Sequence, residues 1–178
     1  NRLVVIVPSG VVGDVPWGLL PSLVGRPVAV NASATGWADA ELRRQRRRDA
    51  GRRRWGLVAG PGLDHADDEI DRLGALLPDA SSLRGEAATS AALVGLLRSC
   101  DVVHVACHGE FRSDNPLFSA LRLADGRLNA YELEALDVLP DTIVLAACST
   151  GAAGTVPGGA LLGFATALTT LGASTVIA

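Results

Sequence analysis

The chain has 178 residues, of which 48% are hydrophobic and 20% are charged, and its formal net charge is −3. These values are typical of one folded domain with a hydrophobic core. The small negative charge gives no overall attraction to nucleic acid or to an acidic membrane. Every apolar run is too short to cross a bilayer, so we expect a soluble protein.

Short apolar runs alternate with helical patterns along the chain, which predicts an α/β fold with a mostly parallel sheet in a three-layer α/β/α sandwich. The predicted strands span residues 3–7, 27–30, 55–59, 101–109, 121–123, 142–147 and 175–178. The predicted helices span residues 39–49, 64–77, 86–98, 130–136 and 161–171, and residues 151–159 form a glycine-rich loop. We expect a single domain over residues 1–178, and because it begins at Asn1 we expect it to be a piece of a longer protein.

The three cysteines are Cys100, Cys107 and Cys148. Their odd number, without a signal peptide, indicates free thiols in a reducing compartment, and we expect the protein to be cytoplasmic. The nearest approach to zinc-ligand spacing adds His104 and His108 to the first two cysteines. Those four residues lie along one strand, which turns alternate side chains to opposite faces and cannot surround one ion. We predict no metal and no cofactor.

Residues 41–54 contain eight arginines and two carboxylates, a local charge of +6. Phosphate contacts by the arginines of residues 43–54 would make nucleic-acid binding fall steeply with salt. The stretch has no aromatic residue apart from Trp55 beside it, and no nucleic-acid-binding motif. We therefore expect a solvated helix and connector, and no nucleic-acid partner.

Two of the predicted strands end in chemically reactive side chains. Residues 101–109 end in His108 and Gly109, and the run that starts at residue 142 ends in Cys148. Reaction sites in open α/β sheets form at the carboxyl ends of strands. Adjacent strands lie about 4.8 Å apart, so residues at two neighbouring ends can face one substrate. We interpret His108 and Cys148 as a catalytic pair.

This pair suits acyl transfer. A thiol attacks only as its thiolate, and an imidazole can accept the thiol proton and return it to a leaving amine. Gly109 lets the backbone approach the substrate, and its N–H, with that of Cys148, would hold the developing oxyanion. Composition alone leaves a structural role for His108 and Cys148 as open as a catalytic one. We expect Cys107, like Cys100, to be a core thiol and His104 to be a buried, hydrogen-bonded histidine.

The chain resembles the CHAT domain, a bacterial branch of the caspase-like cysteine peptidases of clan CD that is usually attached to TPR repeats. The similar segments are residues 3–10 with 15–17, 83–89, 103–109, 115–121 with Leu123, 144–151 and 171–178. The resemblance implies a caspase/hemoglobinase fold, His108 as base, Cys148 as nucleophile and an oxyanion hole at Gly109 and Cys148. Two departures are visible: the family's acidic residue in the loop after the cysteine is missing at residues 158–160, and the chain stops at Ala178, where relatives continue.

The leading hypothesis is a cysteine endopeptidase that cleaves protein or peptide substrates and is regulated by TPR repeats or another upstream module. Related enzymes often hold a basic substrate side chain with an acidic residue, and Glu110 and Asp114, which follow the histidine, are the candidates. Each is also a typical surface carboxylate. The alternative hypothesis is a catalytically silent caspase-like module used for assembly.

Overall fold

The computed structural model describes residues 2–8, 12, 15, 17–31, 33–48, 51, 53–112, 114–149 and 158–177. For residues 46–48, 147–149 and 158–163 the backbone alone is described. Most of the loop that we predict over residues 151–159 therefore lies outside the described residues, and so does Ala178.

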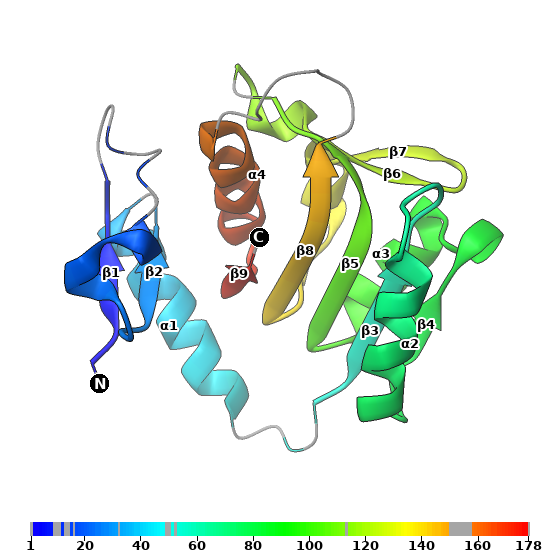
Figure 1. Cartoon of the computed structure of the whole chain (residues 1–178), viewed down its shortest axis with the longest axis horizontal. Coiled ribbons are helices and arrows are strands. Elements are labelled where there is room, and N and C mark those ends of the chain that lie inside the picture. The colour runs from blue at the N-terminus through cyan, green and yellow to red at the C-terminus, as the bar shows by residue number, and fades with distance from the viewer. Residues whose placement is uncertain are drawn as a thin grey trace.

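Strands and helices alternate through most of the chain (Figure 1). The strands are β1 (Val4–Ile6), β2 (Val28–Val30), β3 (Trp55–Ala59), β4 (Ser81–Leu83), β5 (Val102–Glu110), β6 (Ala120–Leu123), β7 (Gly126–Asn129), β8 (Thr142–Ser149) and β9 (Thr175–Ile177). The α-helices are α1 (Ala34–Arg48), α2 (Ala66–Leu76), α3 (Ser90–Ser99) and α4 (Gly158–Thr170). Short 3₁₀ helices span Trp17–Leu19, Pro21–Leu23, Gly85–Ala87, Pro116–Phe118 and Ala130–Ala135. Within the described residues, none of these helices is long and apolar enough to span a bilayer.

The strands form two sheets. β1 and β2 pair with each other in parallel, and the other seven strands form one larger sheet. In that sheet β4, β3, β5, β8 and β9 lie side by side and run parallel. β6 pairs antiparallel with the last residues of β5, and β7 pairs antiparallel with β6 to form a hairpin. The predicted α/β class is confirmed. The finer prediction of a mostly parallel three-layer sandwich is not confirmed, because the larger sheet is mixed and curled (Figure 1).

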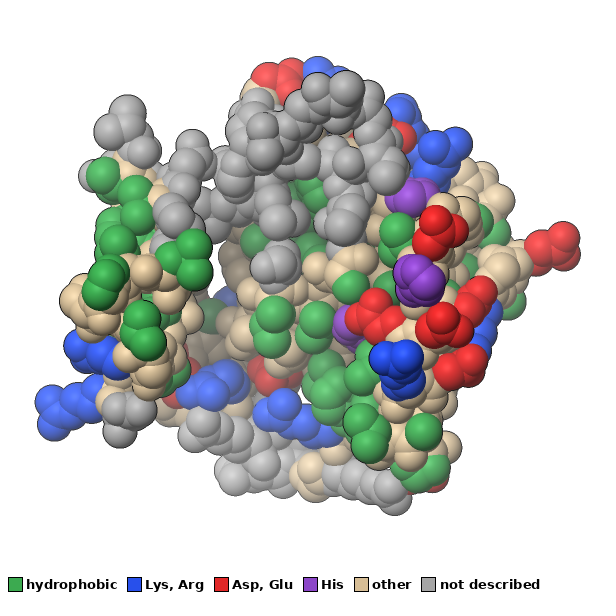
Figure 2. Space-filling view, in the orientation of Figure 1, with side chains coloured by type: hydrophobic (Ala, Val, Ile, Leu, Met, Phe, Trp, Pro, Cys, Tyr) green, Lys and Arg blue, Asp and Glu red, His purple; other side chains and the backbone are tan. Residues whose placement is uncertain are grey.

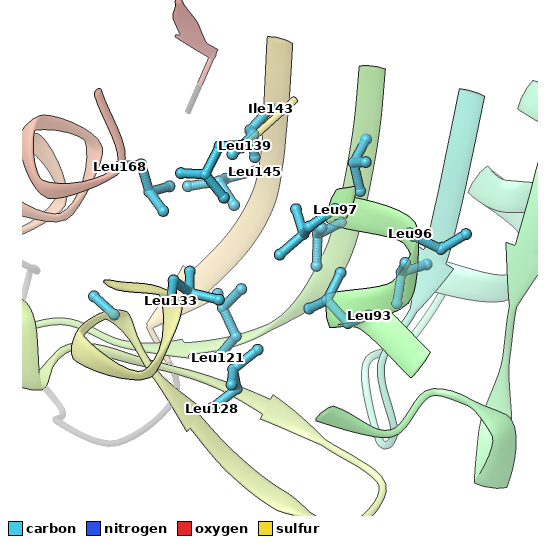
Figure 3. Close-up of a cluster of buried hydrophobic side chains, with 14 of the residues drawn as sticks. Leu93, Leu96, Leu97, Leu121, Leu128, Leu133, Leu139, Ile143, Leu145 and Leu168 are labelled. Carbon is cyan, nitrogen blue, oxygen red and sulfur yellow. The ribbon is translucent and has the colours of Figure 1, made fainter. Parts of the chain in front are cut away.

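The two faces of the larger sheet are covered by different helices. Val103, Val105 and Cys107 of β5 pack into the main core with leucines of α3 and with Phe164 of α4. Figure 3 shows leucines from α3, from the β6–β7 hairpin and from α4 meeting beside Ile143 and Leu145 of β8 (the labelled leucines are Leu93, Leu96, Leu97, Leu121, Leu128, Leu133, Leu139 and Leu168). On the opposite face, Ala106 of β5 packs into a smaller cluster with residues of β3 and α2. Strand alternation therefore separates a large apolar face from a smaller one that α2 covers.

Several elements differ from the sequence-based expectation. β4 and β7 were not predicted, because β4 is a three-residue strand with two serines and β7 contains only one large apolar residue. The helix predicted over residues 130–136 is present as a 3₁₀ helix over Ala130–Ala135. α1 starts at Ala34, five residues before the predicted start, and it is not wholly exposed, because Ala40 is buried. The short hairpin means that the chain returns from β5 to β8 through β6 and β7 as well as through a helix.

Candidate active site

The candidate site lies where β5 and β8 end. The two strands are adjacent and parallel along their length, from Val102 opposite Thr142 to Gly109 opposite Ser149. His108 is the register partner of Cys148. The predicted juxtaposition of the two strand ends is therefore present in the backbone. The side chain of Cys148 is outside the described part of the structure.

The imidazole of His108 is held by a backbone carbonyl. Its Nε2 lies 2.7 Å from the oxygen of Gly62. A carbonyl oxygen only accepts hydrogen bonds, so Nε2 must carry the proton and donate it. In a neutral ring this leaves Nδ1 with its lone pair free. Nδ1 is buried and has no hydrogen-bond partner among the described atoms, so this nitrogen is available to accept a proton from a neighbouring group.

Gly62 belongs to the loop between β3 and α2, and its role was not found from the sequence. Gly62 has φ +70°, in the left-handed region that glycine adopts without strain. Two positions earlier, a Cβ on Gly60 would lie 2.4 Å from the Cβ of Cys107, so only glycine lets this loop pass so close to β5. The signal was the run Gly60–Pro61–Gly62 after a strand, but a sequence does not show that this strand is the neighbour of β5.

A cleft of about 460 Å³ opens beside His108. One wall is the loop with Pro61 and Gly62, and the other is the β6–β7 hairpin, which contributes Arg122 and Leu123. His108 itself lines the cleft, so the imidazole is both anchored and reachable by a ligand. Such a concave space beside a candidate base is where a substrate is expected to bind.

Gly109 also allows a close contact. A Cβ at this position would lie 2.5 Å from the ring of Phe111, and that ring in turn packs against Phe164 of α4 with their centroids 5.4 Å apart. Gly109 has register partners on both sides, Leu121 of β6 and Ser149 of β8. Strand partners on both sides compete for its backbone groups, so the oxyanion role of Gly109 stays a prediction.

The two carboxylates proposed to bind a basic side chain are both engaged elsewhere. Glu110 forms an ion pair with Arg127 of β7, and Asp114 accepts hydrogen bonds of 3.0 and 2.6 Å from Arg112. The hydrogen bond from Arg112 lowers the pKa of Asp114. Neither carboxylate lines the cleft beside His108. Their role in substrate binding stays a prediction that these contacts do not support.

The other cysteines and histidines of β5 and its flank lie in the interior. Cys100 and Cys107 are buried and free, and burial raises the pKa of Cys107 from 9.0 to about 12. The thiol of Cys107 therefore stays protonated and unreactive at neutral pH. His104 is 7% exposed, and its Nε2 lies 2.9 Å from Glu69 Oε1 without the alignment of a hydrogen bond. Among the described residues, no three or more His, Cys, Asp or Glu side chains gather in a metal-binding arrangement.

The chain matches a known protein family over its whole length. The model of the CHAT domain family matches residues 1–178, and the chain belongs to that family. CHAT domains are related to the caspase-like cysteine peptidases. Among curated proteins, no sequence matches the chain.

Proposed function

We propose that this CHAT domain is a cysteine endopeptidase with a caspase-like α/β/α arrangement, in which Cys148 is the nucleophile and His108 is the general base. The proposal rests on the hydrogen bonding of the His108 imidazole. Its Nε2 is fixed to the Gly62 carbonyl and its buried Nδ1 has no hydrogen-bond partner among the described atoms, while Cys148 occupies the register position opposite. A ring fixed in this way is oriented for one specific proton transfer.

The chemistry follows from that orientation. The thiol of Cys148 gives its proton to Nδ1 of His108, and the sulfur attacks the carbonyl carbon of the scissile peptide bond. The resulting imidazolium donates the proton to the leaving amine as the C–N bond breaks, which leaves a thioester on Cys148. A water molecule, deprotonated by the same nitrogen, then hydrolyses the thioester and releases the new carboxyl terminus. The Gly62 carbonyl accepts a hydrogen bond from Nε2 throughout this cycle.

The negatively charged oxygen of the tetrahedral intermediate needs hydrogen-bond donors. The proposal assigns this task to the backbone N–H groups of Gly109 and Cys148. Both stand at the ends of adjacent strands, at the edge of the sheet where the cleft opens. A module such as TPR repeats, which the resemblance to the family implies as a partner, would present the protein substrate and regulate the reaction.

The test compares cleavage of a proteome-derived peptide mixture by the wild-type chain and by Cys148→Ala, with cut sites mapped by mass spectrometry. We expect cleavage by the wild type and a loss of at least about 1,000-fold in the variant, because the nucleophile is removed. Cys100→Ala is the matched control, since Cys100 is buried at the end of α3 and outside the cleft. Equal cleavage by the wild type and Cys148→Ala would contradict the proposal, and so would selective loss in Cys100→Ala.

A further inference from the structure

Arg122 contributes the only permanent charge among the described residues that line the cleft beside His108. It is exposed on β6, and it forms no ion pair with a described carboxylate. A guanidinium presents a planar set of N–H donors that fits the two oxygens of a carboxylate. A positive charge that faces a cleft without a partner is therefore suited to an anionic group on a ligand.

The neighbouring charges do not offset this one. The register partner of Arg122 is Arg127, which already has a carboxylate partner in Glu110. Asp125, at the tip of the hairpin, is held by Ser90: its Oδ1 accepts hydrogen bonds from the Ser90 N–H at 2.8 Å and from Oγ at 3.0 Å. Glu110 and Asp125 are thus already engaged by other donors, and Arg122 is the charged side chain that lines the described part of the cleft.

Acidic side chains do gather over α2, whereas arginines gather over the β6–β7 hairpin (Figure 2). Asp67 and Asp68 belong to the first turn of α2 and do not line the cleft. Physiological salt largely screens the interaction between a ligand and an exposed charge that lies more than about 8 Å away. A direct contact with Arg122 therefore decides the charge preference, and the acids of α2 do not.

The position of Arg122 is fixed by its surroundings. The flanking residues Leu121 and Leu123 are buried in the main core. At the turn, the Ala124 N–H donates to the Ala88 carbonyl at 2.9 Å, which ties the hairpin to the segment before α3. Because the backbone that carries this charge is already ordered, little conformational entropy is lost when a ligand binds. The charge can therefore contribute strongly to selectivity.

We propose that Arg122 is a specificity-determining residue that binds an aspartate or glutamate side chain of the substrate in the cleft beside His108. This inference rests on the proposed peptidase function and names its substrate class. It is opposite to the basic preference that Glu110 and Asp114 would give. Because hydrogen bonds to charged groups are strong, the preference for an acid over its neutral amide is expected to be about tenfold to a hundredfold.

The cleavage arm uses the same peptide mixture and reads the residues around each cut. We expect the wild type to enrich aspartate and glutamate over asparagine and glutamine at one position relative to the cut. Arg122→Gln should reduce that enrichment to within about twofold, and Arg122→Glu should replace it by a preference for basic residues. Arg98→Gln is the matched control, because Arg98 is an exposed arginine of α3, which covers the other face of the sheet. It should keep the acidic preference.

The binding arm does not need catalysis. An acetylated and amidated alanine tetrapeptide with one aspartate is titrated into Cys148→Ala, against the same peptide with asparagine, while the NMR signals of the His108 ring are followed. We expect binding of the aspartate peptide to be at least about tenfold tighter, and this difference to vanish when Arg122→Gln is added.

The outcomes separate the two proposals. Cleavage that depends on Cys148 but shows no acidic enrichment, or an enrichment that survives Arg122→Gln, overturns the role of Arg122 and leaves the peptidase intact. Absence of Cys148-dependent cleavage overturns the peptidase, and the binding arm then decides whether Arg122 recognises an acidic side chain. Equal binding of the two peptides overturns that recognition.

Discussion

The two faces of β5 place two titratable side chains, a thiol and an imidazole, in different environments. On the face covered by α3, Cys107 is sealed in the main core, and its pKa is raised to about 12 by burial. On the face covered by α2, the next residue, His108, lines an open cleft, with Nε2 bound to the Gly62 carbonyl and Nδ1 without a partner in the described part of the chain. Consecutive residues of a strand point to opposite faces of the sheet, so one side chain is buried in the core and the next reaches the cleft. Access to the cleft depends on the face and on the position along the strand, because His104 on the same face is buried.

The sharpest test of this contrast compares the two histidines on the α2 face. His108→Ala should lower cleavage by at least about a hundredfold, because it removes the proposed base. His104→Gln should leave the cleavage rate within about threefold, because His104 lies four residues deeper in the strand and does not line the cleft. Rates are measured on one substrate peptide taken from the cleavage map. A loss in His104→Gln as large as that in His108→Ala, with an unchanged melting temperature, would contradict the assignment of a single base.

The packing of the β3–α2 loop against β5 can be disrupted at Gly60. Gly60→Ala would place a Cβ 2.4 Å from the Cβ of Cys107 and 3.1 Å from the carbonyl oxygen of Arg122. We expect a loss of about 2–3 kcal/mol in the free energy of unfolding, because backbone must shift to relieve the clash. Gly74→Ala in α2 is the control: nothing lies within 4 Å of its added Cβ, so a gain of about 0.5–1 kcal/mol is expected. Urea denaturation measures both, and an unchanged stability of Gly60→Ala would show that the loop is not held against β5.

The buried Cys107 thiol predicts that the free energy of unfolding depends on pH in the alkaline range. Between pH 9 and 12 the Cys107 thiol loses its proton in the unfolded chain but keeps it in the folded one, because its folded pKa is about 12 and its ordinary value is 9.0. The unfolded state then binds fewer protons, so stability falls as pH rises above about 9, by about 1.4 kcal/mol at pH 10. Urea midpoints of the wild type and Cys107→Ala at pH 7.5 and pH 10 measure this effect. The alkaline loss should be smaller in the variant, and equal losses would show that this thiol titrates normally.

The parts of the fold that were predictable are those whose apolar runs are long enough to be buried on both faces. β3, β5 and β8 fall in this class. β4 and β7 are short and polar, and they form because a neighbouring strand offers them partners, which is information that the local sequence does not contain.

The candidate site also has residues that the local sequence predicts and others that only the strand pairing brings in. His108 and Cys148 could be singled out because each has a distinctive side chain at the end of an apolar run. The carbonyl of Gly62 could not, since every residue has one and only the pairing of β3 with β5 brings it to the imidazole. The ion pair of Glu110 with Arg127 depends on the pairing of β6 with β7, a strand too polar to be predicted from its own residues.

That hairpin also determines how the cleft can respond to a ligand. Arg122 is exposed, but the leucines on either side of it are 4% and 2% exposed, so its main chain cannot move without opening the core. Only rotations about its own side-chain bonds remain. The distance at which the guanidinium can meet a ligand is therefore set by the length of the Arg122 side chain alone.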